Sequence, residues 1–217
     1  MSEAAQLAAK LRSQTSIDDP FTGPASPAEV EAKSRAWPES PEWAGIRLVA
    51  VTEGAGRRIE EYAYTPAAGG QEQPVGIVFL EKDGQPHARL YAQHQWVADR
   101  GPILPVDAAL VPASDPADII ARYFPTIGSA DLEATLDLWE ENGYLQHSNG
   151  DTFQGRERLR EDFTKFFQTG GIKLNYCNVT DDGRICALEA YMPSGRPALA
   201  VYERGASGKM AAARLYL

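Results

Sequence analysis

Cysteine, basic charge and long apolar runs are all scarce in this sequence. Only two cysteines occur among 217 residues, Cys177 and Cys186. They fall in neighbouring predicted strands of a chain with no recognisable export signal, which favours two buried thiols over a disulfide. His87 and His94 have no cysteine or second histidine at ligand spacing. We therefore expect no metal, and no cofactor-binding motif is present.

The shortage of basic residues limits the possible partners. The 21 Lys and Arg residues are outnumbered by 30 Asp and Glu, giving a formal charge of −9, and the basic residues are scattered along the chain. This disfavours binding to nucleic acid or to anionic membrane surfaces. Residues 1–14 have neither the apolar core of a signal peptide nor the length of a membrane span. We expect a cytoplasmic protein that binds neither nucleic acid nor membrane.

An internal repeat is the main organising feature of the chain. Residues 45–66 and 171–193 both read Gly-Ile-basic-Leu, then Gly-Arg, then Tyr-x-Pro, and the match continues between 78–91 and 200–216. Two copies of one module explain this best. We assign residues 1–96 to a truncated first module and 115–217 to a complete second one. Residues 97–114, rich in proline and alanine, form a connecting strap, which we expect to be ordered.

Each copy is predicted to combine helices with a sheet. In the second copy, short turns separate strands at 172–180, 184–192, 197–204 and 209–217, which makes them antiparallel neighbours. Three helices precede them. The first is capped at Asp115 and ends or kinks at Pro125, and the others cover about 131–141 and 156–168. The first copy has helices near 3–13 and 26–37 but lacks residues for an equivalent of the first.

The second copy resembles ketosteroid isomerase. Arg122-Tyr-Phe, Gly128–Leu132 and Tyr144–Gly150 follow the first two helices and first strand of that family at the same spacing. The similarity covers about residues 115–217 and is weaker over residues 1–96. The chain also resembles the SnoaL-like polyketide cyclases and, more broadly, the nuclear transport factor-like superfamily.

The resemblance implies a definite architecture. We expect an α+β fold of two cone-shaped modules, each a curved antiparallel sheet wrapped around helices. Modules of this family commonly associate through the outer faces of their sheets. Two copies in one chain would then form an intramolecular pseudo-dimer, and the protein would be a monomer or a weak homodimer.

The resemblance also implies catalytic roles for two residues. Tyr123 falls at the family's oxyanion-stabilising tyrosine, and His147 falls at its proton-shuttling aspartate. The family's second oxyanion donor would fall at about Ala200, which has no proton to give, so steroid isomerase activity itself is not expected. The predicted substrate pocket is apolar and is lined by Trp139, Phe163, Phe167, Tyr202 and Leu215.

Several functions remain open on these residues. In the first module, Asp19 is either a turn residue before Pro20 or half of a site completed elsewhere. The second module is predicted to be a cofactor-free enzyme for isomerisation, dehydration or cyclisation of an apolar, ketone-bearing molecule. One alternative is a binding module that holds an apolar ligand or a partner peptide in the same cone. A third is an epoxide hydrolase or epoxide-opening cyclase, which would require paired carboxylates.

Overall fold

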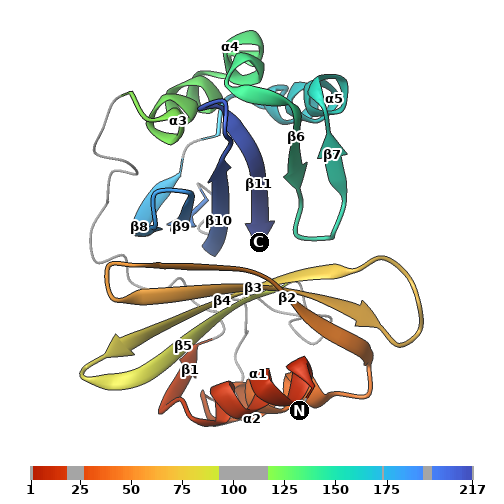
Figure 1. Ribbon diagram of the computed structural model, residues 1–217, viewed down its shortest axis with the longest axis vertical. Coiled ribbons are helices and arrows are strands. Elements are labelled where there is room, and N and C mark those ends of the chain that lie inside the picture. Colours follow the sequence, from red (N-terminus) through yellow and green to blue (C-terminus); the bar gives the residue numbers. More distant parts are fainter. Residues whose placement is uncertain (1, 19–26, 93–116, 173, 193–196, 217) are drawn as a thin grey trace. The chain divides into compact units, whose positions relative to one another are not determined.

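The computed structural model describes residues 2–18, 27–92, 117–172, 174–192 and 197–216 (Figure 1). The chain divides into two compact units. The first contains the elements from α1 (Glu3–Arg12) to β5 (Gln85–Ala92). The second contains those from α3 (Ile119–Ser129) to β11 (Met210–Tyr216), apart from Tyr216. The predicted strap at 97–114 lies outside the described residues.

The first unit is a five-stranded sheet with helices on one face. Its strands lie in the order β1-β5-β4-β3-β2. Strand β1 (Ser16–Asp18) is parallel to β5, and the other neighbours are antiparallel. The remaining elements are α2 (Pro27–Ala36), the short 3-10 helix η1 (Trp37–Glu39), β2 (Trp43–Gly54), β3 (Arg57–Pro66) and β4 (Gln73–Lys82). Helices α1 and α2 lie on the same face of the sheet (Figure 1).

Local sequence explains how this unit begins and turns. The side chain of Ser2 caps α1 by accepting a hydrogen bond from the amide of Ala5, and Leu7 and Leu11 on one side of the helix are fully buried. Strands β4 and β5 are joined by Asp83 and Gly84, which have φ values of 54° and 73°. Asp-Gly favours such a two-residue turn, because positive φ suits both residues.

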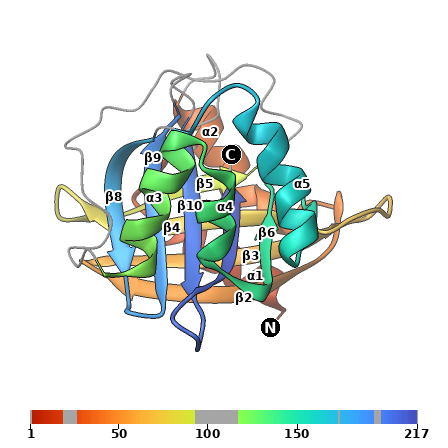
Figure 2. The ribbon, with the colours of Figure 1, turned by 90° about the horizontal axis from the view of Figure 1, so that it is seen from above.

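The second unit has the larger sheet, with six strands in the order β7-β6-β11-β10-β9-β8. Strand β6 (Trp139–Gln146) is parallel to β11, and its other neighbour β7 (Thr152–Gln154) is antiparallel. The other elements are α4 (Leu132–Asp137), α5 (Arg156–Phe167), β8 (Asn175–Asp181), β9 (Ile185–Tyr191) and β10 (Pro197–Arg204). Figures 1 and 2 show α3, α4 and α5 together on one face of this sheet.

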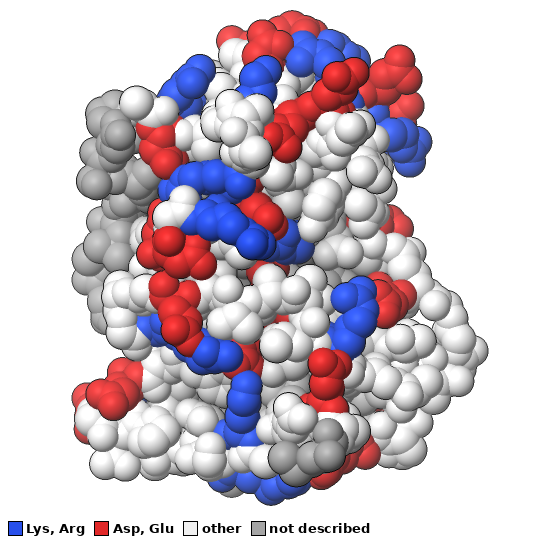
Figure 3. All heavy atoms as spheres, viewed as in Figure 1, with Lys and Arg blue, Asp and Glu red and all other residues white. Residues whose placement is uncertain are grey.

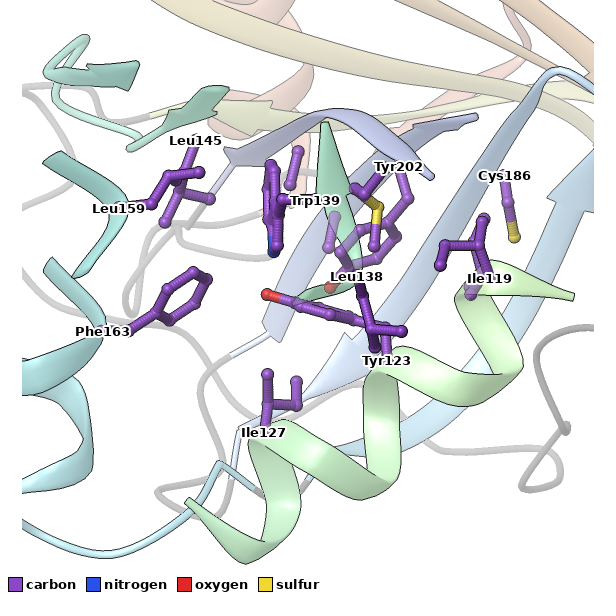
Figure 4. Packing of buried hydrophobic residues seen from close by; sticks show 14 of the residues in the cluster. Ile119, Tyr123, Ile127, Leu138, Trp139, Leu145, Leu159, Phe163, Cys186 and Tyr202 are labelled. Carbon is purple, nitrogen blue, oxygen red and sulfur yellow. The ribbon is translucent and has the colours of Figure 1, made fainter. Parts of the chain in front are cut away.

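The core of the second unit is built from both layers and is rich in aromatic rings (Figure 4). Helix α3 contributes Ile120 and Tyr123, and helix α5 contributes Leu159 and Phe163. The ring centroids of Tyr123 and Tyr202 on β10 lie 5.7 Å apart. Helices and sheet therefore share one apolar interior, as expected when each has one apolar face.

The predicted α+β class with two curved sheets is confirmed. The sheets are not purely antiparallel, because the first strand of each unit pairs in parallel with the last. Helix α3 continues through Pro125 to Ser129 instead of ending there. Its N-cap is Asp118, whose side chain accepts a hydrogen bond from the Ile120 amide at 2.8 Å, and not Asp115.

The predicted helix at 131–141 is wrong in its second half. Helix α4 ends at Asp137, and Trp139 is the first residue of β6. The carbonyl of the preceding residue, Leu138, accepts a hydrogen bond from the amide of Met210 at 2.8 Å. Pairing with β11 therefore overrides the helical spacing of the apolar residues. Gly143, within β6, further disfavours a helix here.

An arginine ties the helical layer of the second unit to its sheet. The guanidinium of Arg204 on β10 makes two hydrogen bonds to Asp181, at 2.9 and 2.7 Å, and one to the α3 cap Asp118 at 2.8 Å. Burial alone would raise the pKa of the Asp181 carboxyl, but hydrogen bonds from Arg204 and from the Gly183 amide hold this pKa below its usual value. The network is only 16–26% exposed, so solvent screens it weakly.

Removing this arginine should destabilise the second unit. Arg204→Ala leaves two carboxylates without their partner, and we expect the free energy of unfolding to fall by about 2 kcal/mol. The measurement is urea denaturation followed by circular dichroism. Arg158→Ala is the matched control, because the Arg158–Glu161 pair is 58% and 55% exposed and should contribute less than about 0.5 kcal/mol. Equal losses in the two variants would contradict this prediction.

Candidate functional site

A histidine and a carboxylate meet between the end of β6 and helix α5. Nε2 of His147 lies 2.9 Å from Oδ2 of Asp162. The Asp162 side chain is only 6% exposed, whereas that of His147 is 22% exposed. The histidine is thus held by a buried acid while part of its ring stays accessible.

Local structure fixes both partners. His147 directly follows β6, and its amide donates to the carbonyl of Asp151 at 2.8 Å, which closes the turn into β7. Gly150 in this turn has a φ of 89°, a conformation that favours glycine. Asp162 lies on the buried side of α5 with Leu159 and Phe163, since residues three and four apart share a helix face.

Aromatic rings surround the histidine. The His147 ring centroid lies 5.1 Å from that of Phe153 and 5.4 Å from that of Phe166. These rings exclude water from much of the imidazole, and a lower local dielectric strengthens its hydrogen bond to Asp162. The surroundings therefore favour one fixed orientation of the ring.

The hydrogen bond also selects a tautomer. An ionised carboxylate can only accept, so Asp162 takes the hydrogen bond from Nε2–H and leaves the lone pair of the neutral ring on Nδ1. No residue in the described part of the chain hydrogen bonds to Nδ1. Nδ1 of His147 is therefore the ring nitrogen with a free lone pair.

Tyr123 lies in the aromatic interior of the same unit. It is 4% exposed, and its ring centroid is 5.9 Å from Trp139 and 6.5 Å from Phe163. Helix α5 connects it with the histidine, because Asp162 contacts His147 while the next residue, Phe163, contacts Tyr123. Figure 4 shows the hydroxyl end of Tyr123 directed toward the α5 side of the core.

The structure places the predicted lining residues in one apolar cluster. Trp139, Phe163 and Tyr202 belong to the core of the second unit, and Phe167 and Leu215 pack against it. Ala200, where the resemblance predicts a second oxyanion donor, is also in this core, and its side chain has no donor. The interior beside Tyr123 is thus apolar.

Sequence reasoning missed Asp162 and the two rings beside the histidine. It considered the apolar stripe Leu159, Phe163 and Phe167 of α5 but not the acid within it. Asp162 follows Leu159 by three positions, which places a charge on the buried face of an amphipathic helix. A buried carboxylate requires a partner, so this pattern is the signal that could have identified the pair.

The first unit contains a second His–Asp pair, next to the position predicted for a site. Asp19 itself lies outside the described residues. Its neighbour Asp18 on β1 has Oδ2 3.0 Å from Nε2 of His87 on β5, and Nδ1 of His87 is 2.7 Å from the Ser16 hydroxyl. The side chain of His87 is 1% exposed. These contacts hold the short edge strand β1 against β5.

A buried carboxylate in the first unit is fully occupied by its neighbours. Glu60 on β3 accepts hydrogen bonds from Lys10 at 2.6 and 2.9 Å, from Arg58 at 2.6 Å and from the Tyr62 hydroxyl. Burial alone would raise the pKa of Glu60, but these donors hold it below its usual value. Glu60 therefore joins α1 to the sheet and is not available as a base.

The Asp18 contact should make the first unit sensitive to acid. Burial alone would raise the pKa of Asp18, but the imidazole of His87 3.0 Å away and the charges of Lys82 and Arg89 hold this pKa below its usual value. A lowered folded-state pKa contributes stability above the unfolded value that is lost as pH falls through the folded value. Asp18→Asn should therefore flatten the fall of unfolding free energy below about pH 4, measured by urea denaturation across pH. An unchanged pH profile would contradict this assignment.

Charge, metal and membrane features add little to the site. Basic and acidic side chains are interspersed on the face shown in Figure 3. Within the described residues there is no cluster of three or more His, Cys, Asp or Glu that could hold a metal ion. None of the described helices has the length and apolar character needed to cross a membrane.

Comparison with known proteins yields structural matches only. No family model and no curated protein matches the sequence. A SnoaL-like protein of unknown function from Burkholderia thailandensis is 13% identical, with a TM-score of 0.41, over 48% of this chain and 97% of that one. The epoxide hydrolase/cyclase-like enzyme SalBIII, described in pyran ring formation in the polyether salinomycin, is 25% identical. The match has a TM-score of 0.38 and covers 45% of this chain and 86% of that one. An NTF2-like protein of unknown function from Cytophaga hutchinsonii is 18% identical. The match has a TM-score of 0.37 and covers 49% of this chain and 93% of that one. Each match covers about half of this chain.

Proposed function

We propose that the second unit is a cofactor-free acid–base enzyme that moves a proton on an apolar, ketone-bearing molecule. The observation that carries this proposal is the 2.9 Å contact between His147 and the buried Asp162. A histidine oriented by a carboxylate, with its other nitrogen unpaired, is a common arrangement for a general base. The apolar cluster around Tyr123 suits the rest of such a substrate.

The proposed reaction begins with proton transfer to Nδ1 of His147. The C–H bond next to the ketone breaks, its electron pair forms a carbon–carbon double bond, and negative charge develops on the ketone oxygen. Asp162 stabilises the imidazolium through Nε2–H, and the Tyr123 hydroxyl donates a hydrogen bond to the oxyanion. Return of the proton to another carbon isomerises the substrate. Its transfer to a departing hydroxyl dehydrates the substrate instead.

The same contacts favour this chemistry over epoxide opening by paired carboxylates. Asp162 is the buried acid of the site, and among the described residues its side chain hydrogen bonds to His147. A carboxylate that orients a histidine supports proton transfer by the imidazole rather than nucleophilic attack by the acid itself. A binding module remains the alternative, since an apolar interior holds a ligand whether or not His147 reacts.

Substitution of either member of the pair should abolish proton transfer without weakening binding. The assay follows exchange of the protons next to the carbonyl of 1-tetralone in D₂O by NMR. We expect His147→Gln to lower kcat on the order of 10²- to 10⁴-fold with KM nearly unchanged. Asp162→Asn should have a similar effect, because the asparagine amide can donate to Nε2 and move the ring proton to Nδ1.

The exposed carboxylate Asp137, which is 68% exposed and pairs with Arg156, supplies the control. Asp137→Asn should leave kcat unchanged, and circular dichroism should show that all three variants fold. If His147→Gln exchanges protons at the wild-type rate, or changes only the affinity for 1-tetralone, the second unit is a binding module and not an enzyme.

A further inference from the structure

The indole N–H of Trp139 is buried without a hydrogen-bond partner. Trp139 is 3% exposed, and no described residue accepts a hydrogen bond from its Nε1. It is the only buried side-chain nitrogen or oxygen without a partner in the described part of the second unit. Leaving such a donor unpaired costs about 1–3 kcal/mol, so its retention in an otherwise satisfied interior requires an explanation.

An indole of the first unit provides a comparison. Nε1 of Trp43 donates to the carbonyl of Trp37 at 2.9 Å. Trp139 has no such carbonyl among the described residues, although it lies at a strand start where backbone groups are close by.

The indole that carries this N–H packs against the ring of Tyr123. The two ring centroids are 5.9 Å apart, and Phe163 lies 6.0 Å from Trp139 and 6.5 Å from Tyr123. Figure 4 shows the oxygen of Tyr123 and the ring nitrogen of Trp139 directed toward the same region, with Phe163 across from them. Polar atoms from two elements, α3 and β6, therefore face the same aromatic region of the core.

The indole is also held in place. The amide of Met210 donates to the carbonyl of Leu138 at 2.8 Å, and Met210 pairs with Trp139 in the parallel ladder. The ring is packed against both Tyr123 and Phe163. A donor fixed before the ligand arrives needs little rearrangement to bind it, which favours stabilisation of developing charge.

We propose that Trp139 N–H and Tyr123 O–H together bind the oxygen of a planar, unsaturated ketone and of the enolate formed from it. This inference rests on the proposed function and deepens it. The indole provides the second donor that Ala200 cannot, and the rings of Tyr123, Trp139 and Phe163 offer faces and edges to a flat ligand. Proton transfer to His147 and back leaves both donors unchanged, so no further reactant is needed.

The test uses 1-tetralone and tetralin, which differ mainly in the carbonyl group. Titration of the ¹⁵N-labelled protein follows the indole N–H resonances, with the Trp139 resonance assigned through Trp139→Phe. We expect 1-tetralone to move this resonance downfield, because the N–H gains an acceptor. Tetralin should not do so, and Trp43, already hydrogen bonded, serves as the internal control.

Affinity supplies the second readout. Trp139→Phe should weaken 1-tetralone binding about 3- to 10-fold, the effect of losing one hydrogen bond. Tetralin binding should change much less, which separates the lost hydrogen bond from the smaller ring. Equal weakening of both molecules, no downfield movement of Trp139 with 1-tetralone, or failure of 1-tetralone to bind would each overturn the inference.

The outcomes also separate this inference from the proposed function. A Trp139 response without proton exchange supports the donor pair and contradicts the enzyme. Proton exchange that depends on His147 without a Trp139 response supports the enzyme and contradicts the donor pair.

Discussion

The parallel pairing of β6 with β11 is the constraint on which the second unit depends. Tyr144, Leu145 and Gln146 pair with Ala212, Ala213 and Arg214, and an irregularity follows toward Met210 and Trp139. Parallel neighbours cannot be joined by a tight turn, so the intervening chain must build the rest of the sheet and α5 before returning. The pairing places Trp139 at the start of β6 and His147 just after its end.

Polar groups within this apolar unit define the chemistry. Asp162 is buried and satisfied by His147, whereas Trp139 carries the one buried side-chain donor left without a partner in the described part of the unit. Burying a polar group without a partner costs free energy, so the partner of Asp162 and the unpaired N–H of Trp139 both need an explanation. In the proposed mechanism, Asp162 leaves Nδ1 of His147 as a base, and Trp139 offers an N–H to a ligand oxygen. In the first unit, Glu60 is held by three partners and is not available as a base.

The fold was largely predictable because its signals are local. The apolar stripe of α5, the positions of the last four strands and the two helices of the first copy all follow from spacing and turn residues. The parallel pairing was not predictable, because it joins strands far apart in sequence. For the same reason Trp139 was assigned to a helix, although its strand partner Met210 decides its conformation.

The site was predictable in part. Position along the chain identified His147 and Tyr123 as candidates, and hydrophobic spacing found the rings around Tyr123. Asp162 was missed because its contact with His147 depends on how α5 packs against β6, which no single sequence displays. The unpaired state of the Trp139 N–H was likewise invisible, since it depends on every neighbouring acceptor at once.

The tautomer of His147 tests the central claim most directly. Ring ¹⁵N chemical shifts distinguish the two neutral forms, and the His147 signals can be assigned among three histidines with the His147→Gln variant. A proton on Nε2, with Nδ1 unprotonated, is the result that the contact with Asp162 predicts. A proton on Nδ1, or the mixture shown by free histidine, would mean that Asp162 does not orient the ring and that Nδ1 is not a prepared base.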